Sequence, residues 1–288
     1  MRAALFPGQG VRTADVLEAL EASPELAGKT SEVLGYDIVK RVRTAARGTS
    51  KVLPTSLAQP AIFTAEVASW KAAEERGERF DFVAGHSLGE YAALVAARSL
   101  TFEDALTLVA ARGEAMGRVS KTANGGMAAV IGLGLDAVTE MAAAAGVSVA
   151  NDNAPDQIVV SGGEEGLARI ASLAHSNGAR TVLLGVEGPY HTKAVAGAAL
   201  KLAAVLRDTP IVTPRIPAVA NVTARPYSHP EEVRDLLIAQ VSSPVRWRES
   251  IEWLWENGAR EFVDMGPGKI LAPLVKRTTK PLAGVARG

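Results

Sequence analysis

The pentapeptide Gly-His-Ser-Leu-Gly at residues 85–89 constrains the fold of this chain more than any other feature. The short run Phe80–Ala84 leads into it and the Ala/Leu-rich stretch Leu88–Leu100 follows at once, so the pattern predicts a strand that turns directly into a helix. Such a turn needs glycines where its two backbone legs meet, and it exposes the residue in the middle. Ser87 is therefore the predicted nucleophile of an α/β fold. The alternative is a glycine-rich turn that carries an incidental serine.

Strands and helices alternate on both sides of this turn, as expected for an α/β domain. In the first 120 residues we predict strands at Ala3–Phe6 and Phe82–Ala84, and helices near Thr13–Ala22, at Gln59–Arg76 and from the Thr101/Asp104 capping box to about Val119. The alternation resumes late in the chain, with helices at Ala194–Arg207, Pro230–Gln240 and Ser250–Asn257 and strands at Pro217–Asn221 and Glu261–Met265.

The segment between these two parts follows a different order. Residues 125–186 predict strand, helix, two strands, helix and strand, with an Asn/Asp/Pro turn between the paired strands. This is the ferredoxin-like split β-α-β order, complete in about 60 residues. We therefore expect a ferredoxin-like subdomain at residues 123–191, inserted in a large α/β domain made of residues 1–122 and 192–288.

Composition limits the classes of function. The formal net charge of the 288 residues is zero, which gives no global support to nucleic-acid binding. The absence of cysteine excludes disulfides and thiolate ligands, no run approaches the roughly 18 apolar residues of a membrane span, and the start predicts a strand rather than a signal peptide. We expect a cytoplasmic, monomeric enzyme with no metal and no membrane contact.

Basic residues gather in two stretches of the sequence. One is residues 192–230, with a single acid, and the other is residues 265–288, with none. An acidic partner would suit such stretches, although a solvated basic face is an equally good explanation. The basic side chains of the second stretch are Lys269, Lys276, Arg277, Lys280 and Arg287.

A serine nucleophile needs a base, and the chain has four histidines: His86, His175, His191 and His229. His86 adjoins Ser87 in a sharp turn and should point away from it, while His175 and His229 lie in polar surroundings. His191 stands where the insert returns to the main domain, at a seam where clefts form, and is the predicted base. No acid clearly completes a triad, so we expect a Ser–His dyad with the base oriented by a backbone carbonyl.

Arg112 falls on the apolar stripe of its helix, together with Ala105, Leu108 and Met116. A guanidinium on such a face needs a carboxylate partner, supplied either by the protein or by the substrate. Backbone N–H groups of Gln9, in the Gly-Gln-Gly loop, and of Leu88 could form an oxyanion hole. The polar turn expected at residues 151–157 would face the substrate channel if the insert caps the cleft, or would simply be a turn.

These residues, taken in order, resemble the malonyl-CoA:acyl carrier protein transacylases and the related acyltransferases of polyketide synthases. The matching motifs run almost end to end: residues 6–10, 59–61, 85–90, 111–113 with Met116, 126–129, 151–162, 189–191, 221–222, 244–247 and 266–268. The chain departs from the usual pattern at Val11 and Arg12, where relatives often have a small residue and a second glutamine. The resemblance implies an α/β-hydrolase-like large domain and a ferredoxin-like small one.

The resemblance also implies roles for individual residues. Ser87 would be acylated with His191 as base, and Arg112 would pair with the free malonyl carboxylate. Gln59, Gln157, Met116 and Tyr190 would line the pocket, and the backbone near Ser243 would orient His191. Tyr190 is bulky where relatives that accept a 2-methyl branch often have serine, which predicts malonyl over methylmalonyl. CoA thioester and the phosphopantetheine of an acidic acyl carrier protein would be substrates, with no bound cofactor.

Other functions share parts of this pattern. A serine thioesterase or hydrolase would have the same turn and dyad, but it has no use for an arginine aimed at an acyl carboxylate. The malonyl-transfer subunit of a malonate decarboxylase is a second alternative. A carrier-binding module without catalysis is a third, and it would need none of Ser87, His191 and Arg112.

Overall fold

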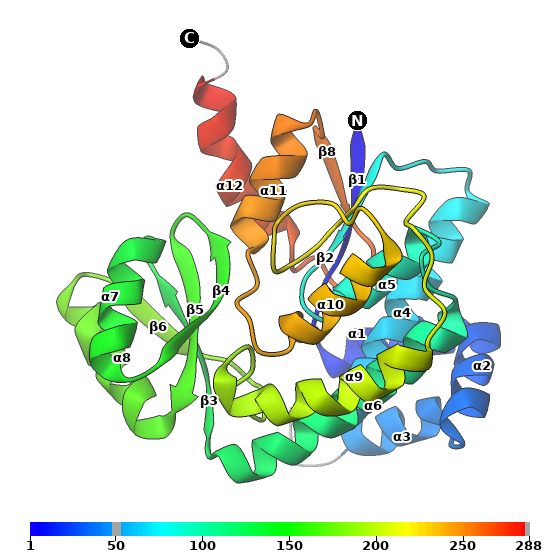
Figure 1. Cartoon of the computed structure of the whole chain (residues 1–288), viewed down its shortest axis with the longest axis horizontal. Helices are drawn as coiled ribbons and strands as arrows, with labels where there is room; N and C mark the ends of the chain where they lie inside the picture. Colours follow the sequence, from blue (N-terminus) through cyan, green and yellow to red (C-terminus); the bar gives the residue numbers. More distant parts are fainter. Residues whose placement is uncertain (48–52, 286–288) are drawn as a thin grey trace.

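The computed structural model describes residues 1–47 and 53–285 and contains two separate sheets (Figure 1). The first is a four-stranded parallel sheet in the order β7-β2-β1-β8. Its central strands are uninterrupted apolar runs, because both faces are covered. The strands are β1 (Arg2–Phe6), β2 (Phe82–Gly85), β7 (Ala218–Val219) and β8 (Glu261–Asp264).

Helices cover both faces of the parallel sheet, and the alternation of side chains along the strands decides which helices each face contacts. Ala4, Phe6 and Val83 belong to a core that includes buried residues of the helices between residues 13 and 123. Ala3 and Leu5 face the other way, into a core with the last two helices. The first group is α1 (Thr13–Glu21), α2 (Pro24–Leu34), α3 (Ile38–Ala46), α4 (Thr55–Glu75), α5 (Gly89–Ala96) and α6 (Phe102–Ala123), joined by α9 (Ala196–Asp208) and α10 (Pro230–Gln240); the second is α11 (Trp247–Glu256) and α12 (Ala272–Val285).

The second sheet is antiparallel and lies beside the first (Figure 1, green). Its order, β4-β5-β3-β6, is that of the ferredoxin-like motif, and α7 (Leu135–Ala145) and α8 (Glu164–Ser176) share a separate apolar core with it. The predicted fold class is thus confirmed, while the domain boundaries at 123 and 191 stay a prediction. The strands are β3 (Gly125–Ile131), β4 (Ser148–Ala154), β5 (Gln157–Gly163) and β6 (Arg180–Leu183).

The segment that contains Val245 and Arg246 connects the small sheet to the large domain through backbone hydrogen bonds. Val245 donates to the carbonyl of Ala150 on β4 at 2.9 Å, and its own carbonyl accepts from Asp152 N–H at 2.9 Å. One residue further, Arg246 N–H donates to the carbonyl of Asn221 at 3.0 Å. Residues 243–246 therefore tie the edge of the small sheet to the loop after β7.

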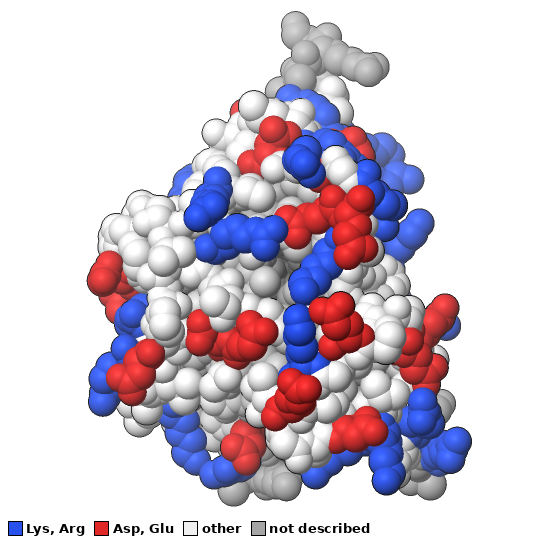
Figure 2. Space-filling view, turned by 90° about the vertical axis from the view of Figure 1, so that its right-hand side faces the viewer, with Lys and Arg blue, Asp and Glu red and all other residues white. Residues whose placement is uncertain are grey.

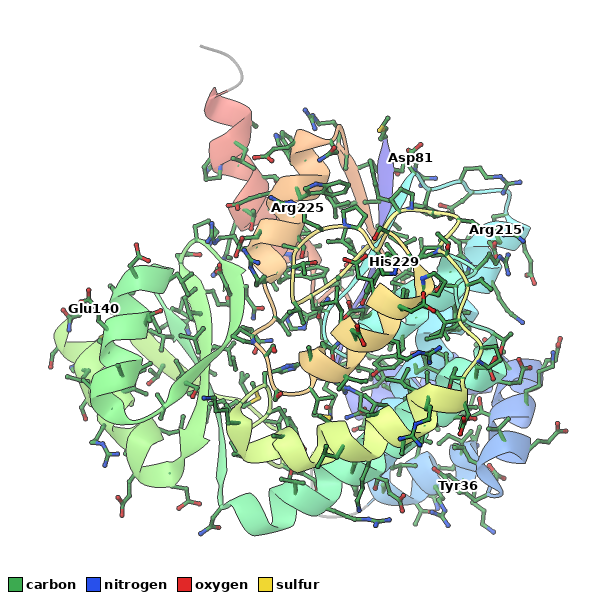
Figure 3. The ribbon with its side chains drawn as sticks, in the orientation of Figure 1. Tyr36, Asp81, Glu140, Arg215, Arg225 and His229 are labelled. Atoms are coloured by element: carbon green, nitrogen blue, oxygen red, sulfur yellow. The ribbon has the colours of Figure 1, made fainter. Side chains whose placement is uncertain are left out.

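Charged side chains of both signs are interspersed on the face shown in Figure 2, with no field of a single sign over it. Arg215 and Arg225 lie far apart in Figure 3, so the basic stretch at residues 192–230 does not form one patch. Lys269, Lys276 and Lys280 are exposed, whereas Arg287 lies outside the described residues. Within residues 1–47 and 53–285, no helix is long and apolar enough to cross a membrane.

Candidate active site

Ser87 lies at the end of β2 in the tight strand–turn–helix predicted for it. Its φ is +53°, a left-handed value that is costly for a residue with a side chain. The backbone is so crowded here that a Cβ on Gly85 would lie 2.0 Å from the carbonyl group of Gly89, and one on Gly89 would lie 2.1 Å from the Phe6 carbonyl oxygen. Both glycines are required by these contacts, and the turn holds the serine hydroxyl above the sheet.

The Ser87 hydroxyl meets an imidazole that comes from far along the chain. The distance between Ser87 Oγ and His191 Nε2 is 2.8 Å. On the other side of the ring, Nδ1 lies 3.0 Å from the carbonyl oxygen of Gln240 and 3.1 Å from that of Ser243. Two acceptors at Nδ1 require the proton there, which leaves Nε2 with the lone pair that faces Ser87. This is a Ser–His pair oriented by backbone carbonyls, one of them from the expected Ser243.

The environment keeps this imidazole uncharged. His191 is buried, with 4% of its surface exposed, and its φ of +59° is again left-handed. Burial, followed by the nearby positive charge of Arg112, lowers the pKa of His191 to about 3. A neutral imidazole is the form that can accept the serine proton.

Arg112 points from α6 to the same serine and is 1% exposed. Its Nη2 donates to Ser87 Oγ at 3.0 Å and to Gln240 Oε1 at 3.0 Å, and its Nη1 donates to Gln59 Oε1 at 2.9 Å. These acceptors are all neutral, and within the described parts of the chain Arg112 forms no ion pair. The sequence left open whether a protein carboxylate or a substrate carboxylate pairs with Arg112. In the described residues, no protein carboxylate pairs with it directly.

Two backbone amides lie beside the serine. The Gly8–Gln9 loop packs so closely on the turn that a Cβ on Gly8 would lie 2.4 Å from the carbonyl oxygen of His86. Among the described residues, neither the Gln9 nor the Leu88 N–H has a hydrogen-bond acceptor, whereas Ser87 N–H is taken by Asn221 Oδ1 at 2.7 Å. Free N–H groups next to a nucleophile are what an oxyanion hole requires.

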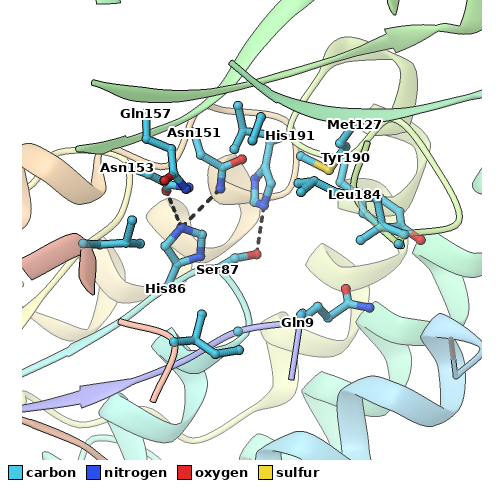
Figure 4. Close-up of a pocket in the computed structure, with 18 of the residues that line it drawn as sticks. Gln9, His86, Ser87, Met127, Asn151, Asn153, Gln157, Leu184, Tyr190 and His191 are labelled. Carbon is cyan, nitrogen blue, oxygen red and sulfur yellow. Dashed lines mark hydrogen bonds between the residues drawn. The ribbon is translucent and has the colours of Figure 1, made fainter. Parts of the chain in front are cut away.

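A cleft of about 450 Å³ opens over Ser87 and His191 (Figure 4). Of the predicted pocket residues, the structure places Met116, Gln157 and Tyr190 in its wall, together with Gln9 from the predicted oxyanion hole. Gln59 lies behind the wall, fully buried, where its Nε2 contacts Met116 Sδ at 3.4 Å. The β6 end and residues 270–274 form the outer rim.

Tyr190 is held in this wall by its hydroxyl. Its Oη lies 2.7 Å from Thr55 Oγ1 and 3.0 Å from Ser120 Oγ, so the loop before His191 is attached to both α4 and α6. The side chain is 3% exposed. The ring is therefore a fixed boundary of the pocket.

The polar residues at 151–157 are arranged differently from the expected turn. Asn151 and Asn153 lie within β4, which continues to Ala154, and their side chains line the cleft. His86 Nε2 lies 2.8 Å from Asn153 Oδ1 and 3.3 Å from Asn151 Nδ2, so His86 connects the turn to the small sheet. The turn is confined to residues 155–156, so the prediction of a turn from residue 151 was wrong: β4 stays paired with β5 as far as Ala154 and also bonds to Val245.

The remaining histidines lie outside the cleft, as expected. His175 is exposed on α8, and His229 is exposed and accepts from Glu232 N–H at the start of α10 (Figure 3). No group of three or more His, Asp and Glu side chains that could hold a metal ion occurs in the described ranges. Sequence reasoning missed Gln240, whose side chain and carbonyl both reach the site; a glutamine at the end of a predicted helix carries no distinguishing signal.

Comparison with known proteins was consistent with this geometry. The family model described as "Acyl transferase domain" matches residues 4–287. The malonyl CoA-acyl carrier protein transacylase of Bacillus subtilis strain 168 is 38% identical over 293 residues, which cover 98% of this chain and 92% of that protein.

Solved structures agree with the sequence matches. The malonyl CoA-acyl carrier protein transacylase of Coxiella burnetii has a TM-score of 0.89 at 34% identity, covering 97% of this chain and 91% of that one. A malonyl-transacylase solved in complex with its type II polyketide synthase acyl-carrier protein has a TM-score of 0.88 at 33% identity, covering 97% of this chain and 93% of that one.

Proposed function

Because this chain belongs to the acyl transferase family, we propose that it is a malonyl-CoA:acyl carrier protein transacylase, serving fatty acid or polyketide synthesis. The observation that carries the proposal is the position of Ser87, whose hydroxyl lies within hydrogen-bond distance of both a neutral base and a guanidinium that no protein carboxylate pairs within the described residues. A hydrolase would have the base but no reason for the guanidinium.

The first half of the reaction acylates the enzyme. Ser87 Oγ attacks the thioester carbonyl of malonyl-CoA and gives its proton to His191 Nε2. The negative charge on the carbonyl oxygen is stabilised by the N–H groups of Gln9 and Leu88. The C–S bond then breaks, and the departing CoA sulfur takes the proton from His191. The product is a malonyl ester of Ser87.

The second half runs the same steps with the carrier. The phosphopantetheine thiol enters in place of CoA, loses its proton to His191 and attacks the Ser87 ester. When the C–O bond breaks, the proton returns from His191 to Ser87 Oγ. The two substrates therefore use one site in turn, and the chemistry needs only side chains and backbone amides of the protein.

Arg112 selects acyl groups that carry a carboxylate. The donors of Arg112 bind neutral protein acceptors, so a substrate carboxylate replaces a weaker bond with a charge-assisted one. A hydrogen bond to a charged group contributes about 1.5–3 kcal/mol, which favours malonyl over acetyl by roughly tenfold or more.

Tyr190 limits the acyl group on its other side. The ring cannot withdraw without breaking its bonds to Thr55 and Ser120, so the pocket prefers malonyl to its 2-methyl homologue. The expected discrimination is modest, because rejecting one methyl is worth about 1–3 kcal/mol.

The carrier is proposed to be an acidic protein that docks over the outer rim of the cleft. Exposed Lys269 and Lys276 adjoin the rim residues 270–274 in sequence, exposed Lys280 follows one turn further along α12, and these lysines would face its acidic side chains. We further propose that the enzyme acts as a monomer in the cytoplasm without a bound cofactor; the lack of cysteine fits a reducing compartment.

Intact mass after incubation with malonyl-CoA, acetyl-CoA or methylmalonyl-CoA tests the proposal. We expect a malonyl adduct that is lost in Ser87→Ala and weakened in Arg112→Ala. A different adduct would keep the mechanism and change the substrate. Should Arg112→Ala raise thioester hydrolysis and leave malonyl transfer unchanged, the transferase assignment would lose its support.

A further inference from the structure

Glu90 is a buried carboxylate in the first turn of α5 that the reaction does not use. It is 1% exposed, and every neighbour that contacts its oxygens is a donor. Oε1 accepts from Asn221 N–H at 2.9 Å and from the Tyr227 hydroxyl at 2.5 Å, and Oε2 accepts from Gln240 Nε2 at 2.5 Å. Burial raises the pKa of Glu90 to about 7, while these donors and the charge of Arg112 act in the opposite direction.

Gln240 lies between this carboxylate and Arg112. Its Nε2 donates to Glu90 and also to the carbonyl of Ser87 at 2.8 Å, and its Oε1 accepts from Arg112 Nη2 at 3.0 Å. Only one orientation of the amide satisfies all three contacts, because turning it would set an NH₂ group against the guanidinium. The Glu90 carboxylate and the Ser87 carbonyl, which both accept from Nε2, therefore determine together which end of the amide faces Arg112.

When Glu90 is ionised, above its pKa of about 7, this arrangement separates two buried charges by one neutral amide. Arg112 has a compensating negative charge nearby, but no carboxylate occupies its donors in the described structure. A direct ion pair would have to be broken before a substrate carboxylate could bind, at a large electrostatic cost. The amide avoids this cost and still holds the guanidinium against Ser87.

We propose that Glu90 is a positioning residue for malonyl selection: through Gln240, its carboxylate aims the Arg112 guanidinium at the acyl group on Ser87. This inference rests on the proposed function. The inference extends the proposed function, because it assigns acyl-group selectivity to a side chain that contacts neither the Ser87 hydroxyl nor the cleft.

The substitution Glu90→Gln tests the proposal, because it replaces one oxygen by a donor. Two partners converge on Oε1, and one of them is a backbone N–H that cannot turn, so the new carboxamide should keep its oxygen there and direct its NH₂ at Gln240. Gln240 then either sets its own NH₂ against the new one, or turns its amide and presents Nε2 to Arg112 and Oε1 to the Ser87 carbonyl; both arrangements disturb the contact that aims the guanidinium. We expect the ratio of malonyl to acetyl loading of Ser87, measured by intact mass in one protein sample, to fall by about tenfold or more.

Two substitutions serve as matched controls. Tyr227→Phe removes one donor from Oε1 of the same carboxyl group but leaves Oε2, which accepts from Gln240. Glu66→Gln removes another fully buried carboxyl, which lies on α4 and has no partner among the described residues. Both should leave the malonyl-to-acetyl ratio within about twofold of wild type, whatever they do to stability.

A second variant makes the test independent of the folding of Glu90→Gln. Gln240→Met keeps the carbonyl that orients His191 but removes the acceptor for Arg112, so the same loss of ratio is expected. The double variant should lose no more than either single one. Proportional loss of malonyl and acetyl loading, an unchanged ratio or a rise in the ratio in the folded variants would each overturn the proposal. Absence of a malonyl adduct in wild type would instead reject the proposed function.

Discussion

The two reacting residues, Ser87 and His191, have strained backbone conformations, and this strain helps to fix the positions of the reacting groups. Both have positive φ values, +53° and +59°, which glycine alone adopts without cost. Strain of this kind persists only where the surroundings enforce it, here through the crowded turn at Ser87 and the carbonyls of Gln240 and Ser243 at His191. The hydroxyl and the imidazole are therefore fixed before substrate arrives.

The low pKa of His191 leads to a test of the base. Burial and then Arg112 lower this pKa to about 3, so the imidazole is neutral and remains a competent base as the pH falls through the usual 6.5. We expect the rate at which phenylmethanesulfonyl fluoride, an uncharged reagent, inactivates Ser87 to show no midpoint near 6.5 between about pH 5 and about pH 8. Arg112→Met removes the second cause, so any acid limb should move to higher pH. A wild-type rate that halves near the usual value would contradict this account.

Glu66 gives a prediction about stability. It is fully buried on α4, its oxygens have no hydrogen-bond partner among the described residues, and burial raises its pKa well above 4.5. A raised carboxyl pKa means that its favourable contribution is present below the unfolded-state pKa and is lost as the pH rises towards the folded value. Glu66→Gln cannot ionise and should be the more stable protein at about pH 8, by about 1–3 kcal/mol, with a smaller difference at about pH 5.

Urea unfolding of both proteins at the two pH values would check this. Equal differences at both values would show that Glu66 is ionised and paired in the folded protein.

Much of the site could be predicted from single residues, because their surroundings in the sequence were specific. Ser87 was identified by its flanking strand and helix, and Arg112 by its position on an apolar stripe. The partners of Arg112 could not be found in this way, since Gln59 and Gln240 come from distant helices and depend on how those helices pack. The roles of these residues remain predictions that the adduct experiments address.

Among the helices and strands, α6 gives a prediction: removing its N-cap hydroxyl should lower the stability of the protein without changing its catalysis. Thr101 Oγ1 accepts from Asp104 N–H at 3.0 Å and donates to Asp104 Oδ2 at 2.6 Å. Removing an N-cap hydroxyl costs about 1 kcal/mol. We expect Thr101→Ala to lower the free energy of unfolding by about that amount in urea titrations, while malonyl loading of the folded protein is unchanged. A loss of loading at equal stability would mean that the cap positions Arg112, which lies about three turns along the same helix.

Most elements were predicted where periodicity and capping agreed, but the sequence prediction did not include α2, α3 and α12. The signals for two of them were present: Pro24 and Gly35 bracket α2, and the Asp37 side chain caps α3 by accepting from Lys40 N–H. Helix α4 begins at Thr55, a turn before the predicted Gln59, because the Glu187 carboxylate accepts from Thr55 N–H at 2.6 Å. That acceptor is 132 residues away, so no local pattern could reveal it.

For the whole molecule, the proposed carrier surface makes a prediction about charge. Lys276→Glu should slow malonyl transfer to an acidic carrier by up to about tenfold at low salt and by less at high salt, because the effect is electrostatic steering. Loading from the N-acetylcysteamine thioester of malonate, which lacks the CoA phosphates, should change little. Arg215→Glu, the same charge reversal at an exposed site far from the small sheet, is the control (Figure 3). Equal slowing by both variants would exclude docking at the rim.

The tie between β4 and Val245 has a consequence for engineering. The small sheet cannot be exchanged between relatives by replacing only the continuous segment from β3 to β6. Its edge strand, β4, also bonds to Val245, which comes from late in the chain. That segment includes Ser243, whose carbonyl lies 3.1 Å from Nδ1 of His191. A graft that alters the pairing by one residue would move this carbonyl and misalign the base. Chimeras should therefore carry β4 and residues 243–246 from the same parent.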